Sequence, residues 1–266
     1  MYDYHMHSSF SGDCQYTMEE MICGAIDKNV NTIVFTDHID YDCTSDNIDF
    51  TYDLADYFKE LSKLKLKYKH SLEVLAGIEI GMQPHLSEKV AGLINNNNFD
   101  FVIMSTHIVK GLDLHDGSFY KNKKIKEIYY GYYEDLLENI KNIEDFSVVG
   151  HIDLVDRYQK YFGDKLNLKD YKDILEIIFK KLISMGKGIE INTSGIRYGI
   201  NNFHPTKEIV NFYKELGGEI ITIGSDAHTP QDIVANYDDA VDLLKELNFK
   251  YLTIFKDMKP KFIKIK

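Results

Sequence analysis

Histidine and acidic side chains recur in short motifs along this 266-residue chain. Neutral imidazole and carboxylate are the protein ligands that Zn, Mn and Fe ions prefer. Two histidines at positions i and i+2 of a strand point to the same side, so His5 and His7 can hold one ion together. The candidate metal ligands, nine in all, are His5, His7, Asp13, His38, Glu79, His107, His151, Asp226 and His228.

The number of these groups indicates a site with more than one ion. If one carboxylate is shared, they supply about three ions with three or four protein ligands each, which leaves positions for water and substrate. Two or more such ions suit phosphoester hydrolysis, because they activate a water and neutralise the charge that develops on the phosphoryl oxygens. Each motif alone is weak evidence, and it is their combination that favours a metal-dependent hydrolase.

Alternating β-branched runs and helical stretches predict the elements that position these groups. Strand–helix units without hairpin signals indicate a parallel α/β sheet, open or closed into a barrel. The expected strands are Tyr2–His7, Thr32–Asp37, Glu73–Ile80, Asp100–His107, Ser147–His151, Gly188–Asn192 and Glu219–Ser225. The expected helices are Thr17–Lys28, Asp53–Lys69, Ser87–Ile94, Lys123–Ile143, Leu168–Met185, Pro205–Leu216 and Asp232–Leu247.

Most candidate metal ligands lie at the ends of the expected strands. Almost every expected strand ends in an imidazole or a carboxylate, and functional residues of parallel α/β barrels gather at the carboxyl ends of the strands. Thr17 and Glu20 form a capping box at the start of the first expected helix. A last apolar run, Tyr251–Phe255, is either an eighth strand or a tail packed on the outside.

Composition limits the class of protein. The formal net charge of -11 argues against long nucleic acid as the main partner, because binding a phosphate backbone needs a basic surface. No apolar stretch is long enough to span a membrane, and the N-terminus lacks the features of a secretory signal. Three cysteines without CxxC spacing argue against a disulfide framework, so we expect a cytoplasmic protein whose oligomeric state the sequence leaves open.

Arginine is rare in this chain. Of the 31 basic residues only Arg157 and Arg197 are arginines, and both follow expected strand ends. Because a guanidinium binds phosphate with two parallel hydrogen bonds, we expect these two residues to bind phosphate or substrate. His115 lies in the loop after the fourth expected strand, where we expect it near the substrate.

The motifs also carry a family resemblance. "HMHSSFSGD", "FTDH", "GIEIG", "STH", "GHIDLV", "EINTSGIRYG" and "GSDAH" occur in this order between residues 5 and 228. In this the chain resembles the PHP (polymerase and histidinol phosphatase) superfamily, and more narrowly its monofunctional histidinol-phosphate phosphatases. The resemblance implies a distorted (β/α)7 barrel, one PHP-type domain over residues 1–266, and three divalent metal ions, Zn, Mn or Fe, at the C-terminal ends of the strands.

The resemblance also implies ligand sets and a reaction. His5, His7, Glu79 and Asp226 would hold the first ion, Glu79 would bridge to a second ion held by His107 and His151, and Asp13, His38 and His228 would hold the third. Asp13 stands where some PHP proteins have a histidine. A metal-bridging hydroxide would attack the phosphorus of L-histidinol phosphate, a small phosphomonoester of histidine biosynthesis. Glu79, Asp226 and His228 would be the catalytic residues, and Arg157 or Arg197 would hold the phosphoryl oxygens.

Two other readings remain open. The chain could be another PHP phosphoesterase, acting on a phosphodiester or on phosphotyrosine in a protein. It could instead be a metal-binding module that has lost catalysis, but such a module would show gaps among the ligand positions, and all nine are filled.

Overall fold

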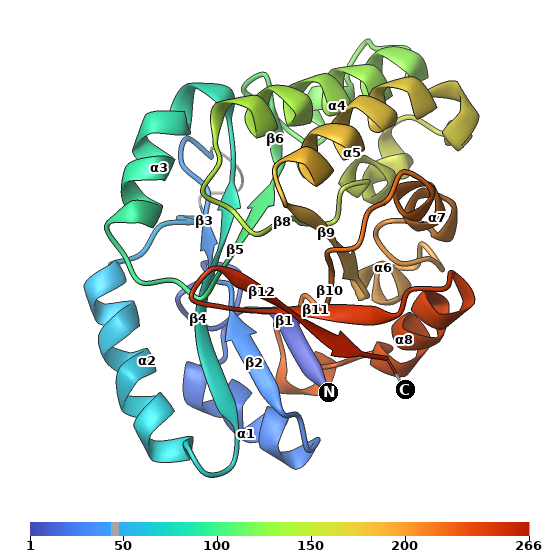
Figure 1. Ribbon diagram of the computed structural model, residues 1–266. Coiled ribbons are helices and arrows are strands. Elements are labelled where there is room, and N and C mark those ends of the chain that lie inside the picture. Colours follow the sequence, from blue (N-terminus) through green and yellow to red (C-terminus); the bar gives the residue numbers. More distant parts are fainter. Residues whose placement is uncertain (44–47, 266) are drawn as a thin grey trace.

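Parallel strands joined by helices form the barrel at the centre of the molecule (Figure 1). The structure is a computed structural model that describes residues 1–43 and 48–265. Within these residues the strands pair in parallel, in the order in which they follow one another along the chain. They are β1 (Tyr2–Met6), β2 (Thr32–Phe35), β4 (Glu73–Gly81), β5 (Phe101–Ser105), β8 (Val148–Val149), β9 (Gly188–Asn192) and β10 (Ile221–Gly224). The short β3 (His38–Ile39) continues the sheet beside the end of β4.

The first and last strands of the barrel, β1 and β10, lie against each other and nearly close it. The amide of Asp226 donates a hydrogen bond to the carbonyl oxygen of His5 at 2.7 Å. Buried Asp3 accepts hydrogen bonds from the amide of Ser225 at 2.9 Å and from its hydroxyl at 2.6 Å. This arrangement confirms the predicted distorted (β/α)7 barrel.

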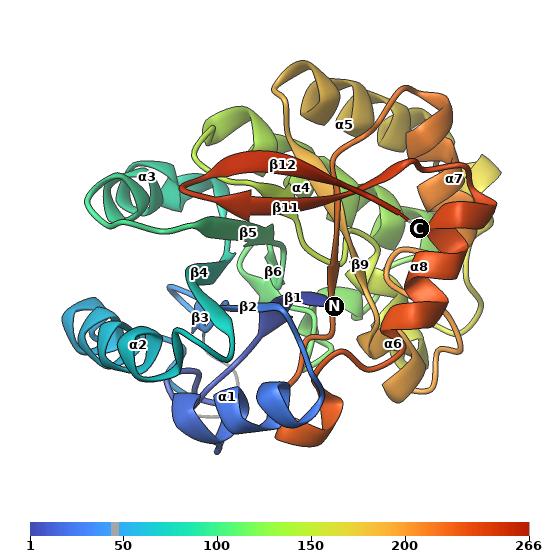
Figure 2. The same ribbon diagram turned by 60° about the horizontal axis from the view of Figure 1, so that its bottom comes forward.

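Helices cover the outside of the barrel (Figures 1 and 2). Thr17 and Glu20 form the expected capping box at the start of the first of them. The longer helices are α1 (Met18–Asp27), α2 (Leu54–Tyr68), α3 (Ser87–Asn95), α4 (Ile125–Asn142), α5 (Lys172–Ser184), α7 (Lys207–Glu215) and α8 (Tyr237–Glu246). The shorter ones are η1 (Pro84–Leu86), η2 (Ser118–Tyr120), η3 (Leu154–Tyr161), η4 (Leu168–Asp170), α6 (Ser194–Arg197) and η5 (Pro230–Asp232). None of the helices described here combines the length and apolar character that a membrane span requires.

A hairpin covers the N-terminal end of the barrel. It consists of β11 (Tyr251–Lys256) and β12 (Lys259–Lys264), which pair antiparallel. Phe255 packs on Tyr4 and Phe101 inside the barrel, and the Tyr4 hydroxyl donates a hydrogen bond to the Phe255 carbonyl oxygen at 2.8 Å. Of the two alternatives for Tyr251–Phe255, the eighth barrel strand is wrong, because this segment pairs with β12 in a separate two-stranded sheet, and the segment packed on the outside of the barrel holds.

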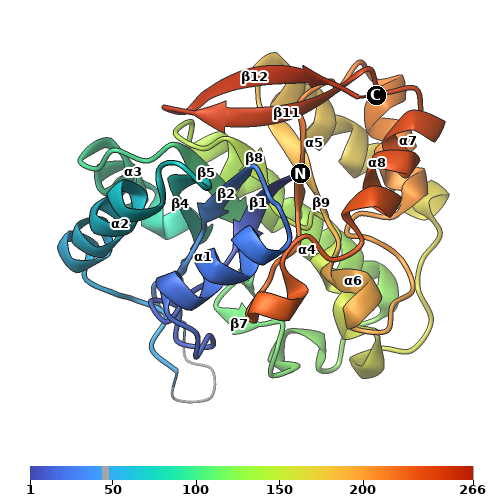
Figure 3. The ribbon, with the colours of Figure 1, turned by 90° about the horizontal axis from the view of Figure 1, so that it is seen from below.

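A second hairpin lies at the opposite, C-terminal end. It consists of β6 (Ile108–Val109) and β7 (Leu112–Asp113), and Figure 3 shows β7 on the far side of the barrel from β11 and β12. No hairpin was predicted in this segment. Several expected strands are also shorter than predicted, so that His7, Asp37, His107 and His151 lie just beyond strand ends rather than within them. Residues beyond a strand end belong to loops. Because the backbone of a loop need not keep the alternation of a strand, these side chains can point toward a common centre.

Candidate metal centre and active site

The candidate ligands lie together at the C-terminal end of the barrel. His5, His38 and Glu79 lie on strands β1, β3 and β4, and the others follow strand ends or lie on connecting loops. Glu79 is at the centre, with its carboxylate completely buried. Its Oε2 atom lies 2.9 Å from Nε2 of His5 and 3.2 Å from Nδ1 of His38. Its Oε1 atom lies 2.8 Å from Nε2 of His151 and 3.3 Å from Nε2 of His107.

Asp226 provides a second carboxylate beside the first histidine pair. Its Oδ1 atom lies 3.3 Å from Nε2 of His7, 3.8 Å from Nε2 of His5 and 3.6 Å from Nδ1 of His228. Nε2 of His7 also lies 3.6 Å from Oε2 of Glu79. The four side chains expected to hold the first ion are therefore brought together.

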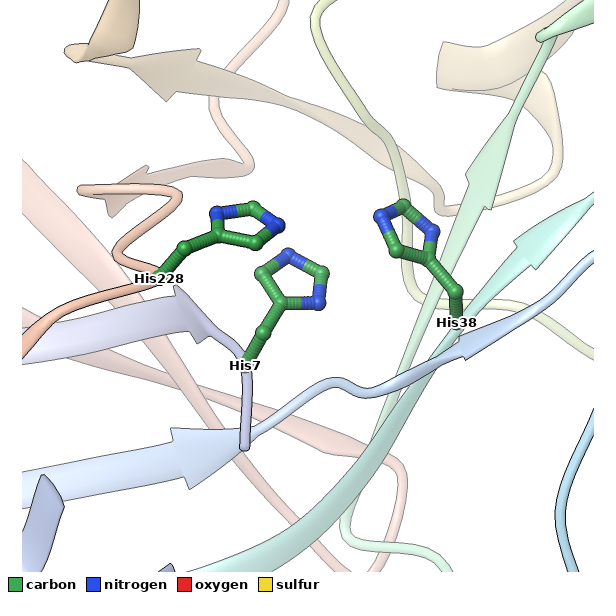
Figure 4. Close-up of side chains that lie close together, drawn as sticks. All are labelled: His7, His38 and His228. Atoms are coloured by element: carbon green, nitrogen blue, oxygen red, sulfur yellow. The ribbon is translucent and has the colours of Figure 1, made fainter. Parts of the chain in front are cut away.

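The outer part of the cluster consists of Asp13, His38 and His228. Oδ2 of Asp13 lies 3.1 Å from Nε2 of His228 and 3.9 Å from Nε2 of His38. The ring of His7 lies between those of His38 and His228, with centroids 4.4 and 4.1 Å away (Figure 4).

Donor atoms approach closely enough to share an ion in three triplets. The triplets are His5, His7 and Glu79; His38, Glu79 and His107; and His7, His38 and His228. His38 belongs to two of them, so the structure places it between the second and third expected groups rather than in the third alone. All nine expected ligands nevertheless lie in one connected cluster.

His7 shows that the cluster suits a metal ion. Its Nδ1 atom lies 3.1 Å from the hydroxyl of Ser11, while its buried Nε2 atom has no hydrogen-bond partner. Burial, together with the neighbouring His228 and His38, lowers the pKa of His7 to about 3. The ring is therefore neutral at physiological pH, and its lone pair on Nε2 is available to an ion.

The carboxylates are held in the ionised form that a metal requires. Burial alone would raise the pKa of Glu79, but the surrounding histidines, His5 and His38 foremost, hold it well below the usual value. The pKa of Asp226 is also held well below the usual value, because His5, His7 and His228 outweigh burial. Positive charge around Glu79 is thus favourable, and divalent ions supply it.

Two further carboxylates, which were not among the predicted site residues, contact the ring nitrogens of the histidines that face away from Glu79. Oε1 of Glu190 lies 2.7 Å from Nδ1 of His5, and Oδ2 of Asp40 lies 2.6 Å from Nδ1 of His107. A carboxylate at one ring nitrogen fixes the tautomer and directs the other nitrogen toward a metal. Glu190 did carry a signal: "GIEIN" at 188–192 repeats the pattern of "GIEIG" at 77–81, with one acid inside an apolar strand.

The backbone is locally constrained at two of the ligands. Asp226 and His151 have positive φ angles of 54° and 22°, which L-residues rarely adopt. The amide of His151 donates to Oε2 of Glu190 at 3.0 Å, which helps to hold this conformation. A Cβ atom at Gly224 would lie 2.3 Å from Cβ of His5 and 2.4 Å from Oε1 of Glu190, so only glycine allows this close packing.

A cavity of about 520 Å³ opens over the cluster. Of the expected substrate-binding residues, Arg157 and His115 line it. The guanidinium of Arg157 donates to the hydroxyl of Ser194 at 2.7 Å and to Oδ2 of Asp226 at 3.4 Å, and it lies 4.5 Å from the centre of the Tyr198 ring. Arg157 is therefore positioned between the carboxylate cluster and the cavity.

Arg197 is placed differently. It is not among the residues that line the cavity, and its Nη2 atom donates to the backbone carbonyl oxygens of Ser225 at 3.2 Å and Asp226 at 2.8 Å. Its Nε atom lies 3.7 Å from Asp232. These contacts hold the loop that carries Asp226, so the geometry favours a positioning role over the expected contact with phosphate.

The barrel with acids and histidines at its C-terminal end defines a family. The PHP domain model matches residues 3–194, which is most of the chain. The chain belongs to the PHP domain family, as the motifs indicated.

Its relatives narrow the class further. The chain is 32% identical to "Probable histidinol-phosphatase" of Clostridium acetobutylicum, over 94% of this chain and 95% of that protein. It is 31% identical to the histidinol-phosphatase of Lactococcus lactis, over 97% of this chain and 95% of that protein. A crystal structure of histidinol phosphate phosphatase from Lactococcus lactis, complexed with zinc, L-histidinol and phosphate, matches with a TM-score of 0.87 and 29% identity, covering 98% of each chain. The predicted likeness to histidinol-phosphate phosphatases is thus confirmed.

Proposed function

We propose that this chain is a metal-dependent phosphomonoesterase that hydrolyses L-histidinol phosphate to L-histidinol and phosphate. The observation that carries the proposal is the position of Glu79, whose two oxygens each lie within 3.3 Å of two imidazole nitrogens. A carboxylate that faces histidines on both sides is suited to bridge two ions. The full-length likeness to histidinol-phosphatases supports the choice of substrate.

We assign three divalent ions, Zn, Mn or Fe, to the nine ligands. The first set is His5, His7, Glu79 and Asp226, the second is Glu79, His107 and His151, and the third is Asp13, His38 and His228, with His38 also beside Glu79 of the second set. Imidazole and carboxylate suit all three metals. When bound, such ions supply a water of lowered pKa and positive charge opposite the phosphoryl oxygens.

The side chains around the ions bind and orient the substrate. Arg157 points a guanidinium at the cavity and is backed by Ser194 and Asp226, so it can hold phosphoryl oxygens next to the metal ligands. Lys160 adds a second positive charge to the lining. His228 lies within hydrogen-bond distance of Asp13, which together with Asp226 outweighs burial and raises the pKa of His228 to about 9.

The size of the cavity is consistent with a small biosynthetic substrate. A cavity of about 520 Å³ has the size of a small-molecule site. We infer that residues 1–266 form one PHP-type domain, and that the protein works in the cytoplasm, which accords with a sequence whose three cysteines show no CxxC spacing.

The test is kcat/KM of the purified, metal-analysed protein on three substrates: L-histidinol phosphate, a generic aryl phosphate and a phosphodiester. We expect a preference of about 1000-fold for L-histidinol phosphate, which corresponds to about 4 kcal/mol of differential transition-state binding. Unselective turnover with a full metal complement would reject the named substrate. Faster cleavage of the diester would assign the chain to another class of phosphoesterase.

A further inference from the structure

We propose that the buried pair Asp153–His204 positions Arg157, so that its guanidinium reaches phosphate bound at the metal centre. The inference rests on the proposed function and adds two positioning residues to it. Neither residue is among the candidate metal ligands, and neither is among the described residues that line the cavity. Asp153 belongs to the motif "GHIDLV", in which only His151 has a role in the proposed ligand sets.

The two side chains form a hydrogen-bonded pair away from solvent. Nδ1 of His204 lies 2.6 Å from Oδ1 of Asp153, and both residues are completely or almost completely buried. Oδ2 of Asp153 accepts a hydrogen bond from the amide of Thr206 at 3.0 Å. Among the described residues, Nε2 of His204 has no hydrogen-bond partner, so Asp153 is the one side chain that bonds to this ring.

A polar pair of this kind suits positioning better than stability. Two apolar side chains of similar volume would fill the same space about as stably, whereas a hydrogen bond fixes the direction of both partners. Asp153 also stands at the N-cap position of η3, where an aspartate ordinarily bonds to the first amides of its own helix. Its carboxylate makes no such cap and turns to His204 and Thr206 instead.

Asp153 controls the start of the helix that carries Arg157. It directly precedes η3, and its carbonyl oxygen accepts a hydrogen bond from the amide of Asp156 at 2.9 Å, which forms the first turn. The direction in which η3 leaves the barrel therefore depends on how Asp153 is held. Because Arg157 follows directly after this turn, the pair with His204 sets where its side chain begins.

His204 is also linked to the group that the guanidinium contacts. Its backbone pairs with that of Asn192 at the end of β9, through amide-to-carbonyl bonds of 2.7 and 2.9 Å. Oδ1 of Asn192 accepts from the hydroxyl of Ser194 at 2.5 Å, and this hydroxyl in turn accepts from Arg157 at 2.7 Å. A Cβ atom at Gly195 would lie 3.2 Å from Cδ2 of His204, so the segment after Ser194 packs directly on the ring.

These contacts form a closed path around Arg157. One side runs from Asp153 along η3 to the guanidinium, and the other returns through Ser194 and Asn192 to His204. The Asp153–His204 bond joins the two sides. A guanidinium binds phosphate through two parallel hydrogen bonds only when it is held within about 0.5 Å of the right position. Without this bond the path is open at one point, and η3 can shift relative to β9.

The experiment measures the dissociation constant of inorganic phosphate by calorimetry on the zinc-loaded protein, together with its metal content. His204→Leu removes the ring nitrogens at similar volume, and we expect the dissociation constant to rise about 10-fold, the effect of losing one well-aligned hydrogen bond to a charged group. His204→Asn keeps an N–H donor near the position of Nδ1 and should stay close to the wild type. Metal content should not change in either variant.

Two controls separate positioning from a general loss of stability. Tyr213→Phe also loses one buried hydrogen bond, to the carbonyl oxygen of Ile220 at 3.0 Å, but this bond lies before β10 at the N-terminal end of the barrel. It should leave phosphate affinity unchanged. In an Arg157→Met background, His204→Leu should cause no further loss, because the pair acts on phosphate through Arg157.

Four results would overturn the inference. They are an unchanged phosphate affinity in His204→Leu, an equal loss in Tyr213→Phe, an equal loss in His204→Asn, and an undiminished effect of His204→Leu in the Arg157→Met background. Loss of metal in His204→Leu would assign the pair to the metal centre and reject the inference as well. If His204→Leu does not fold, His204→Gln serves, because its amide lies nearer the position of Nε2: weaker phosphate binding supports the proposal, and wild-type binding rejects it.

Failure of the proposed function is recognised separately. A wild type that does not hydrolyse L-histidinol phosphate rejects the proposed function, whereas the phosphate affinities of the variants need no turnover and still decide whether the pair positions Arg157. A zinc-loaded wild type that binds no phosphate rejects the inference itself.

Discussion

The Nδ1 atom of His5 lies 2.7 Å from Oε1 of Glu190, and both side chains are buried. On the opposite side of the ring, Nε2 faces Glu79 at 2.9 Å. The carboxylate of Glu190 therefore keeps the proton on Nδ1, so that Nε2 would be presented to a metal ion held beside Glu79. The amide of His151 also donates to Glu190, so one carboxylate orients two ligands.

Replacing Glu190 by glutamine tests this role. The amide keeps the shape but removes the negative charge that makes His5 a better ligand. We expect metal affinity to fall about 10- to 100-fold, measured by competition with a chelator of known affinity. Glu144→Gln, an exposed site outside the cluster, is the control and should keep wild-type affinity. Equal affinities in the Glu190 variant and the control would show that Glu190 does not tune the site.

The two arginines can be separated by the same conservative change. Arg157→Lys loses the forked guanidinium that faces the cavity, so we expect the inhibition constant of inorganic phosphate to rise about tenfold or more. Arg197→Lys alters the contacts to the carbonyl oxygens of Ser225 and Asp226 and to the carboxylate of Asp232, and phosphate inhibition should change much less. Competitive inhibition assays with both variants decide the matter. A larger effect in the Arg197 variant would reverse these assignments.

Asp135, which belongs neither to the ligand cluster nor to the cavity lining, gives a prediction about stability. It is buried on α4, its Oδ2 atom has no hydrogen-bond partner, and burial raises its pKa to about 6, while a backbone hydrogen bond from Lys110 opposes the shift. Because the folded-state pKa is above the unfolded value of about 3.9, the fold favours the neutral acid. The wild type should therefore lose stability as the pH rises from about 4 to about 6.

Asp135→Asn removes this penalty. We expect the variant to exceed the wild type in free energy of unfolding by about 1 to 3 kcal/mol at pH 7.5, and by much less at pH 4.5. Urea unfolding at the two pH values measures both differences, with the exposed Glu134→Gln on the same helix as control. A variant that is less stable at pH 7.5, or a gain of equal size at both pH values, would contradict the account.

The barrel and its metal ligands were predictable because the hydrophobic pattern of the strands and the metal-binding residue types occur together along the sequence. Each buried parallel strand reads as a β-branched run, and the residues after it carry the histidines and acids. The run Gly188–Asn192 matches β9 residue for residue, whereas Ser147–His151 contains only the two-residue β8. Loops around His151 take their conformation from tertiary hydrogen bonds, which the sequence does not display.

The hairpin β11–β12 was missed for a similar reason. Its turn is Asp257–Met258, with positive φ angles of 50° and 59°, and it lacks the Asn-Gly or Asp-Gly pair that marks such turns in a sequence. Asp40 was missed because an acid two residues after His38 is indistinguishable from a surface residue until the fold brings it to His107. The different role of Arg197 likewise depends on the course of the loop that carries Asp226.

Glu79→Gln tests the central claim most directly, because every proposed step depends on the bridging carboxylate. The measurement is kcat/KM on L-histidinol phosphate together with the metal content of the purified protein, with Glu73→Gln at the exposed start of the same strand as control. We expect the Glu79 variant to fold, to bind fewer ions than the wild type and to lose about 1000-fold or more in kcat/KM. A Glu79→Gln protein with wild-type activity and a full metal complement would contradict the account.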